Sequence, residues 1–184
     1  MVTTEFLEAW AATKREEQGY ANNPNDKGGP TNHGITEVVA RADGFTGDMR
    51  NLPVERAREI AKKQYWDVMR LDDVAAISPK IARELFDSGF LSGINTAAKW
   101  LQRLLNVMNR EQRVYGDIKT DGVLGNVSIY NLKLYMEARR KDNGEAVMLK
   151  ALNALQGAYL IGISEGREAN EEFIFGWLAN RVEL

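Results

Sequence analysis

The sequence predicts an all-α fold with a minor β-hairpin, and three observations lead to that expectation. Apolar residues recur at helical spacing along most of the 184 residues. Strand signals are weak, and only the segments GYA and HGIT, within residues 19–36, are expected to pair as a small hairpin. The length suits one domain, or two small lobes that share a core.

The first helix is expected to begin at Thr3 or Thr4, since either hydroxyl can cap a helix N-terminus. It is expected to end near Glu17, because Gly19 suits the position after a helix end. Side chains spaced four, three and four residues apart form a single stripe along this helix: Phe6, Trp10, Thr13 and Glu17.

Seven further helices are expected, covering residues 36–42, 52–69, 78–93, 94–109, 128–140, 145–160 and 170–182. In the second of these, Pro53 suits the first turn. One face of that helix is expected to carry Val54, Ala57, Ile60, Ala61, Tyr65 and Val68. In the last helix, the aromatic residues Phe173, Phe175 and Trp177 are expected in the core, with stacking on a sugar as the open alternative for one of them.

Composition excludes several classes of protein. The net charge of −2 lacks the basic excess of a protein that follows nucleic-acid phosphates. Zero cysteines exclude disulfides and thiolate metal sites. Glu5 and Glu8 interrupt the place of a secretory signal, and the apolar segment GAYLIGIS is too short to span a bilayer, so we expect no membrane insertion.

The polar stretch EEQGYANNPNDKGGPTNHGIT, residues 16–36, carries the most distinctive chemistry. Glu17 follows the apolar stripe at a helix C-terminus, where lost hydration and the helix dipole both raise the pKa of a carboxyl group. A carboxylic acid that keeps its proton near neutral pH can donate it to the leaving oxygen of a glycosidic bond.

Asp26 is the natural second carboxylate for this reaction, because it lies in a hydrated turn where it stays ionised. Thr31 offers a hydroxyl that can orient a water, and Gly28 and Gly29 let the backbone approach a ligand. The alternative interpretation is structural: Glu17 as a solvated acid at a helix end, and Asp26 as a turn former among asparagines.

The same stretch resembles the signature of glycoside hydrolase family 108, the phage and bacterial N-acetylmuramidases. Matching positions are Glu17, Gly19, Tyr20, Asn23, Asp26, Gly28, Gly29, Thr31, Gly34, Ile35 and Thr36. Further matches are YWD, LFDS, WLQRLLN, DGVLG and FGWLANRV, which together cover nearly the whole chain. Gln18 and Lys27 depart from the signature without removing a functional group.

The resemblance implies a lysozyme-like fold of two helical lobes flanking a glycan cleft. Residues 1–95 would form the catalytic lobe, and residues 96–184 a lobe similar to a peptidoglycan-binding region, packed with the first as one unit. The catalytic set would be Glu17 as general acid with Asp26 and Thr31. Substrate contacts are expected from Tyr20, Asn23, Gly29, Asn32 and Thr36.

The expected activity is hydrolysis of the β-1,4 bond between N-acetylmuramic acid and N-acetylglucosamine in peptidoglycan glycan strands. A phage endolysin of this kind would act as a monomer. It would accumulate in the host bacterial cytoplasm and reach the periplasmic wall through a lesion made by a holin-like partner. Non-catalytic wall-binding or secretion-associated proteins, and structural components of a phage particle, are the alternatives.

No cofactor or metal is expected. The single histidine, His33, suits a structural or cleft-lining role, and the segment DIKTDGVLGNVS fails as a calcium loop because Lys119 occupies a ligand position. The basic segment ARRKDNG, residues 138–144, is expected to be a solvated helix end, with contact to anionic wall polymers as the alternative.

Overall fold

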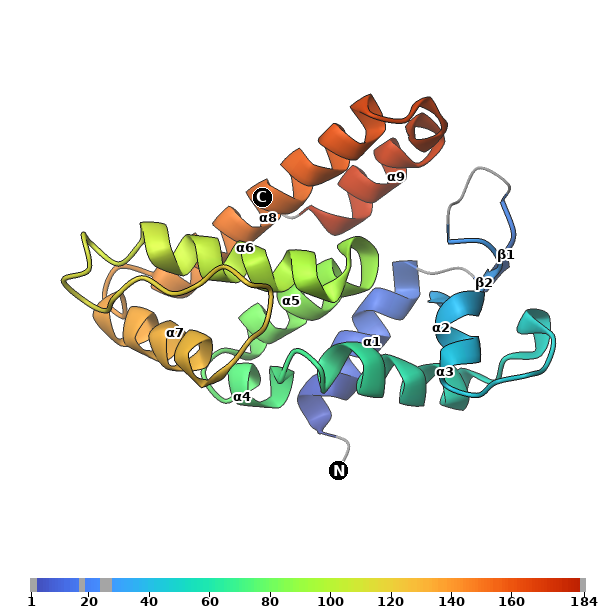
Figure 1. The fold of residues 1–184 in the computed structure, drawn as a ribbon, viewed down its shortest axis with the longest axis horizontal. Coiled ribbons are helices and arrows are strands. Elements are labelled where there is room, and N and C mark those ends of the chain that lie inside the picture. Colours follow the sequence, from blue (N-terminus) through green and yellow to red (C-terminus); the bar gives the residue numbers. More distant parts are fainter. Residues whose placement is uncertain (1–2, 17–18, 24–27, 183–184) are drawn as a thin grey trace.

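The computed structural model describes residues 3–16, 19–23 and 28–182. The predicted all-α fold with a small β element is confirmed (Figure 1). The α-helices of the described residues are α1 Thr4–Glu16, α2 Glu37–Ala42, α3 Val54–Ala61, α4 Leu71–Ala75, α5 Pro79–Ser92, α6 Ile94–Val107, α7 Asn126–Ala138, α8 Gly144–Glu165 and α9 Glu171–Arg181. The remaining elements are the strands β1 Tyr20–Ala21, β2 Thr31–Asn32 and β3 Ile35–Thr36, the 3-10 turns η1 Met49–Asn51 and η3 Glu168–Asn170, and the π-helix η2 Lys62–Trp66.

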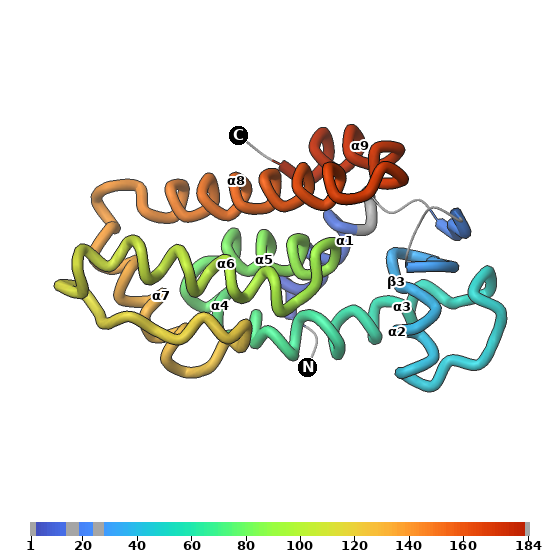
Figure 2. The backbone as a smooth tube through the Cα atoms, turned by 45° about the horizontal axis from the view of Figure 1, so that its top comes forward, coloured from blue at the N-terminus to red at the C-terminus, as the bar shows by residue number. Residues whose placement is uncertain are grey.

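The helices gather around α5, which contacts α1, α4, α6 and α8. Helix α9 folds back along α8, while α2, α3 and the small sheet lie at one end of the molecule (Figures 1 and 2). Helix α7 and the long loop before it lie at the other end (Figure 1). One continuous apolar core joins these elements, since its buried residues run from Phe6 on α1 to Leu152 on α8.

The centre of this core is a triangle of aromatic rings from α1, η2 and α5. Phe6, Trp66 and Phe86 have no exposed surface, and their ring centroids lie 5.5–5.9 Å apart in edge-to-face arrangements. The Trp66 indole donates to Asp72 Oδ1 at 2.8 Å, and the same oxygen accepts from Thr3 Oγ1 at 2.9 Å. Thr3 also accepts from the Phe6 amide at 3.4 Å, so it is the cap of α1.

The predicted helix 52–69 is interrupted by the π-helix, and its buried face differs from the expected one. The Asp67 amide donates to the Lys62 carbonyl at 2.8 Å, five residues back, which inserts one extra residue into the turn. Burial therefore shifts from the expected Tyr65 and Val68 to Trp66 and Met69, and Val68 is 53% exposed. The prediction assumed an uninterrupted period of 3.6 residues.

The short helix α4 was not predicted. It has only five residues and follows Arg70, whose φ is 54°. A helix of that length carries too little periodicity to be recognised in the sequence.

Among the described residues, α8 is long and apolar enough to cross a membrane, with a mean hydropathy of 1.4 over its most apolar window, 33% of which is buried. In this structure α8 packs against α5, α6 and α9. It also buries the polar side chains Asn153, Gln156 and Ser164. Its apolar character thus contributes to the core of the protein.

A buried ion pair joins three helices near the C-terminal end of α1. Arg181 of α9, 7% exposed, pairs with Asp87 of α5, whose Oδ1 also accepts from Thr13 Oγ1 of α1 at 3.2 Å. A second pair, Arg83 with Glu8, also connects α5 to α1, but both of its side chains are about half exposed. The chain therefore offers a buried and an exposed pair on the same helix.

We expect Asp87→Ala to lower the free energy of unfolding by roughly 3 kcal/mol, because it removes a carboxylate that pairs with the buried Arg181 guanidinium. Glu8→Gln, which removes the exposed pair, should cost less than about 1 kcal/mol. Urea denaturation of both variants measures the difference. Equal losses of unfolding free energy in the two variants would contradict the assignment of Asp87 as the residue that joins α1, α5 and α9.

Candidate active site

The signature stretch is built on the three-stranded sheet, and its strand pairing differs from the expected hairpin. Strand β1 pairs antiparallel with β2, which pairs antiparallel with β3, so GYA does not pair with HGIT. His33 and Gly34 connect β2 to β3 with φ of 52° and 75°. Two consecutive residues at positive φ are typical of a type I′ hairpin turn. From the sequence, His33 was expected to have a structural or cleft-lining role, and this turn was not predicted.

Two of the predicted catalytic residues, Glu17 and Asp26, lie outside the described residues. The stripe that precedes Glu17 is described: Phe6, Trp10 and Thr13 are 0%, 6% and 3% exposed. The expected inward direction of this stripe is therefore confirmed as far as Thr13. After the helix, Gly19 has a φ of 61°, a conformation that favours glycine.

Thr31, the third predicted catalytic residue, is half-buried on β2. Its Oγ1 donates to the Gly29 carbonyl at 3.1 Å, across a tight turn. Gly29 itself has a φ of 67°, and a Cβ there would meet no atom of the described residues within 4 Å. Glycine is thus required at this position by the backbone conformation, and the space beside it is open to a ligand.

Asn32 and Thr36, two of the predicted substrate contacts, hold the sheet in place. The Asn32 side chain is buried, and its Nδ2 donates to the Met49 carbonyl at 2.8 Å and the Arg50 carbonyl at 3.3 Å. Thr36 caps α2 by accepting from the Val39 amide at 3.4 Å. Both residues therefore have structural roles in the signature, and their contact with a sugar stays a prediction.

Tyr20 and Asn23, two further predicted substrate contacts, differ in exposure and in contacts. Tyr20 is 40% exposed on β1. Asn23 Nδ2 donates to Glu172 Oε1 of α9 at 3.0 Å, which connects the signature to a helix 149 residues later in the chain. Nothing local in the sequence indicates this contact, because the two segments are brought together only by the packing of α8 and α9.

Helix α9 presents a polar and aromatic face beside this contact. Phe175 lies three residues after Glu172, on the same side of the helix, and is 84% exposed. Phe173 and Trp177 stack with ring centroids 5.7 Å apart and are only partly buried. The expectation that these aromatic residues belong to the core was wrong, because α9 packs on α8 at the surface of the bundle.

A charged cluster fixes the helices beneath the sheet. Asp43, at the end of α2 and with 3% of its side chain exposed, pairs with Lys63 at 2.6 Å and Arg56 at 2.5 Å. The hydrogen bond from Lys63 and the charge of Arg56 outweigh burial and hold the pKa of the Asp43 carboxyl below its usual value. Asp43 thus remains ionised and ties α2, and with it β3, to α3 and η2.

Metal ligands do not gather anywhere in the described part of the chain, where no three His, Cys, Asp or Glu side chains could hold an ion. His33 is half-buried in the type I′ turn between β2 and β3.

Comparisons with known proteins agree with this arrangement. Residues 10–93 match the family Glycosyl hydrolase 108, and residues 96–182 match the family Predicted Peptidoglycan domain. The two matches meet at the link between α5 and α6. The assignment of a catalytic lobe to residues 1–95 and of a peptidoglycan-binding lobe to residues 96–184 stays a prediction.

A solved structure described as SagA of Brucella abortus superposes with a TM-score of 0.65 and covers 97% of this chain and 96% of its own. At 22% identity it shows that the fold is shared. No curated protein matches the chain. The first half of the chain thus matches the glycosyl hydrolase 108 family and the second half a predicted peptidoglycan domain, and these matches support hydrolysis of peptidoglycan.

Proposed function

We propose that the chain is an N-acetylmuramidase, which hydrolyses the β-1,4 bond between N-acetylmuramic acid and N-acetylglucosamine. The observation that carries this proposal is the buried stripe of α1. Phe6, Trp10 and Thr13 face the core, and the signature glutamate, Glu17, follows four residues after Thr13 in the sequence. A carboxyl group beside such a surface is suited to keep its proton near neutral pH.

In the proposed reaction Glu17 gives its proton to the glycosidic oxygen, and the bond between that oxygen and the anomeric carbon breaks. Asp26 either stabilises the oxocarbenium-like transition state or positions the attacking water, and Thr31 assists through its hydroxyl. Water supplies the new hydroxyl on the anomeric carbon and returns a proton to the enzyme. The half-buried Thr31 on β2, beside the open space at Gly29, supports this placement.

The glycan strand would pass between β1 and α9. The hydrogen bond between Asn23 and Glu172 supports this path, because it brings the signature next to the exposed face of α9. Phe175 on that face offers an apolar ring to the flat face of a sugar. The proposal adopts, for this residue, the sugar-stacking alternative to a place in the core.

We also propose that the enzyme is a phage endolysin. In this role it would act as a monomer, accumulate in the host cytoplasm, and reach the wall through a membrane lesion made by a holin-like partner. The resemblance to phage N-acetylmuramidases supports this role. A non-catalytic wall-binding or secretion-associated protein is the other candidate, and it would bind sacculi without releasing sugar ends.

Wild-type protein should release muropeptides that end in reducing muramic acid from purified sacculi, and Glu17→Gln should lose at least about 99% of this activity, since the general acid is removed. Mass spectrometry of the digests identifies the bond that is cut. Equal release by the two proteins would reject Glu17 as the acid. Release of fragments ending in reducing glucosamine would reject the muramidase specificity, and no release by either would favour the non-catalytic candidate.

Phe175→Ala in the Glu17→Gln background should weaken binding to sacculi roughly fivefold, because a stacking surface is lost. The free energy of unfolding should stay unchanged, as the side chain is 84% exposed. Tyr130→Ala on α7 removes another exposed aromatic ring, 60% exposed, and is the matched control. Equal binding by Phe175→Ala and the control, in a sedimentation assay, would remove α9 from the glycan path.

Expression in a Gram-negative host should cause lysis only when a holin is produced together with the protein, measured as loss of culture turbidity. Glu17→Gln with the holin is the control for lysis by the holin alone. Lysis without the holin would contradict dependence on a membrane lesion.

A further inference from the structure

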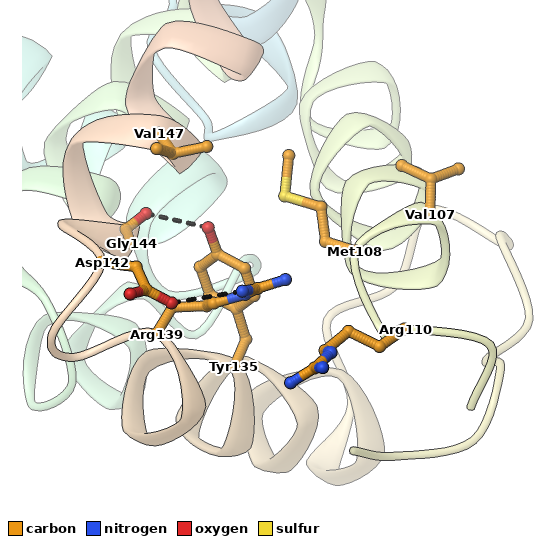
Figure 3. A pocket seen from close by; sticks show the side chains of 8 residues that line it. All are labelled: Val107, Met108, Arg110, Tyr135, Arg139, Asp142, Gly144 and Val147. Carbon is orange, nitrogen blue, oxygen red and sulfur yellow. Dashed lines mark hydrogen bonds and ion pairs between the residues drawn. The ribbon is translucent and has the colours of Figure 1, made fainter. Parts of the chain in front are cut away.

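A pocket of about 400 Å³ (Figure 3) lies among α6, α7 and α8. Helix α7 is at the end of the molecule away from the signature (Figure 1). It is formed by the C-terminal ends of α6 and α7, the residues that follow them, and the first turns of α8. Its lining residues are Val107, Met108, Arg110, Tyr135, Arg139, Asp142, Gly144 and Val147. All of them belong to the region that matches the predicted peptidoglycan domain, residues 96–182.

Two guanidinium groups face each other across this pocket. Figure 3 shows Arg110 and Arg139 extending toward one another from opposite walls. Arg139 pairs with Asp142 at 3.2 Å, whereas the Arg110 guanidinium makes no hydrogen bond or ion pair with any described residue. Two cations and one carboxylate leave an excess of one positive charge, so the pocket favours an anion of low charge.

The rest of the wall is apolar. Val107, Met108 and Val147 line it, and the ring of Tyr135 forms its base. The Tyr135 hydroxyl donates to the Gly144 carbonyl at 2.9 Å, so its proton is already used within the protein. A ligand that suits these walls combines a carboxylate with small aliphatic groups. A phosphate polymer would leave the apolar surface of the pocket without an apolar contact.

The Arg110 backbone is held in an unusual conformation. Arg110, Glu111 and Gln112 have φ of 58°, 58° and 63°, three consecutive residues in the left-handed region. The buried Asn109 holds the turn: its Oδ1 accepts from the Gln112 amide at 3.0 Å, and its Nδ2 donates to Asp117 at 2.6 Å. The position of Arg110 is thus set by the fold, as is usual where a side chain must meet a ligand.

We propose that this pocket binds the stem peptide of peptidoglycan, with a peptide carboxylate between Arg110 and Arg139 and an alanine methyl group against the apolar wall. This inference rests on the proposed function only in taking peptidoglycan as the substrate. Stem peptides are short, carry several carboxylates and contain alanine, which matches the charge and surface of the pocket. The enzyme would then recognise the peptide at one end of the molecule and the glycan at the other.

The two arginines of the basic segment 138–144 line different pockets. Arg139 lines this pocket, whereas Arg140 lines a separate hollow with Lys133 and Glu137. Only one arginine of the segment therefore contributes to the proposed site.

A synthetic stem tetrapeptide tests the proposal with the full-length chain, by calorimetry and by NMR chemical-shift mapping. The peptide has no glycosidic bond, so its binding is independent of whether the chain cleaves glycan. Arg110→Gln should weaken binding at least tenfold, because a charge-assisted contact is lost. Arg113→Gln removes the same charge from the same loop, at an exposed residue paired with Glu111, and should change binding less than twofold.

Two further measurements distinguish specific binding of the peptide in the pocket from an effect on folding and from non-specific attraction between charges. Val147→Phe fills the pocket without changing its charge and should also abolish binding. The peptide with its carboxyl groups amidated should bind at least tenfold more weakly than the free acid. Equal binding by wild type and Arg110→Gln, equal binding of the amidated peptide, or shift changes confined to residues outside 107–147 would each overturn the proposal.

Discussion

The buried pair between Arg181 and Asp87, with Thr13 as a third member, determines how the parts of the candidate active site are arranged. It is the point where α1, α5 and α9 meet. Helix α1 leads to the signature glutamate, and α9 carries the Glu172 that contacts Asn23. A charge buried this deeply needs its partner in place. The junction therefore fixes the end of α1 relative to the helix that we propose as the opposite wall of the glycan path.

The polar character of residues 16–36 has a structural explanation as well as the proposed catalytic one. Asn32 satisfies two carbonyl groups of the η1 turn, and Thr36 caps α2. Glycine stands at 19, 29 and 34 where φ is positive. Because so short a sheet cannot be held by its own ladder alone, side-chain hydrogen bonds and tight turns supply the remaining constraints. The Asp43 cluster beneath the sheet extends the same support to α3.

Most of the fold follows from local patterns in the sequence. Periodicity predicts the long helices, and Thr36 and Ser78 are found at the caps of α2 and α5. The π-helix at 62–66 was not predicted, since a single inserted residue changes which side chains are buried without changing composition. The signature predicts the chemistry of the site through Glu17 and Asp26, which lie outside the described residues.

Contacts between distant segments could not be predicted. The hydrogen bond from Asn23 to Glu172 depends on how α9 folds back on the bundle, and the pocket around Arg110 and Arg139 depends on how the ends of α6 and α7 meet the start of α8. A hydrophobic pattern or motif in one segment does not specify which distant segment it will contact. The same reason explains the aromatic residues of α9, whose helical spacing suggested burial while their position in the bundle leaves Phe175 exposed.

The continuous core, from Phe6 to Leu152, crosses the boundary between the two family matches. Helices α5 and α6 pack directly against one another across that boundary. The two halves therefore resemble the faces of a single bundle more than modules joined by a linker. Exchange of either half by recombination would succeed only with a replacement that presents a matching apolar surface, so evolution of this architecture is constrained to change both halves together.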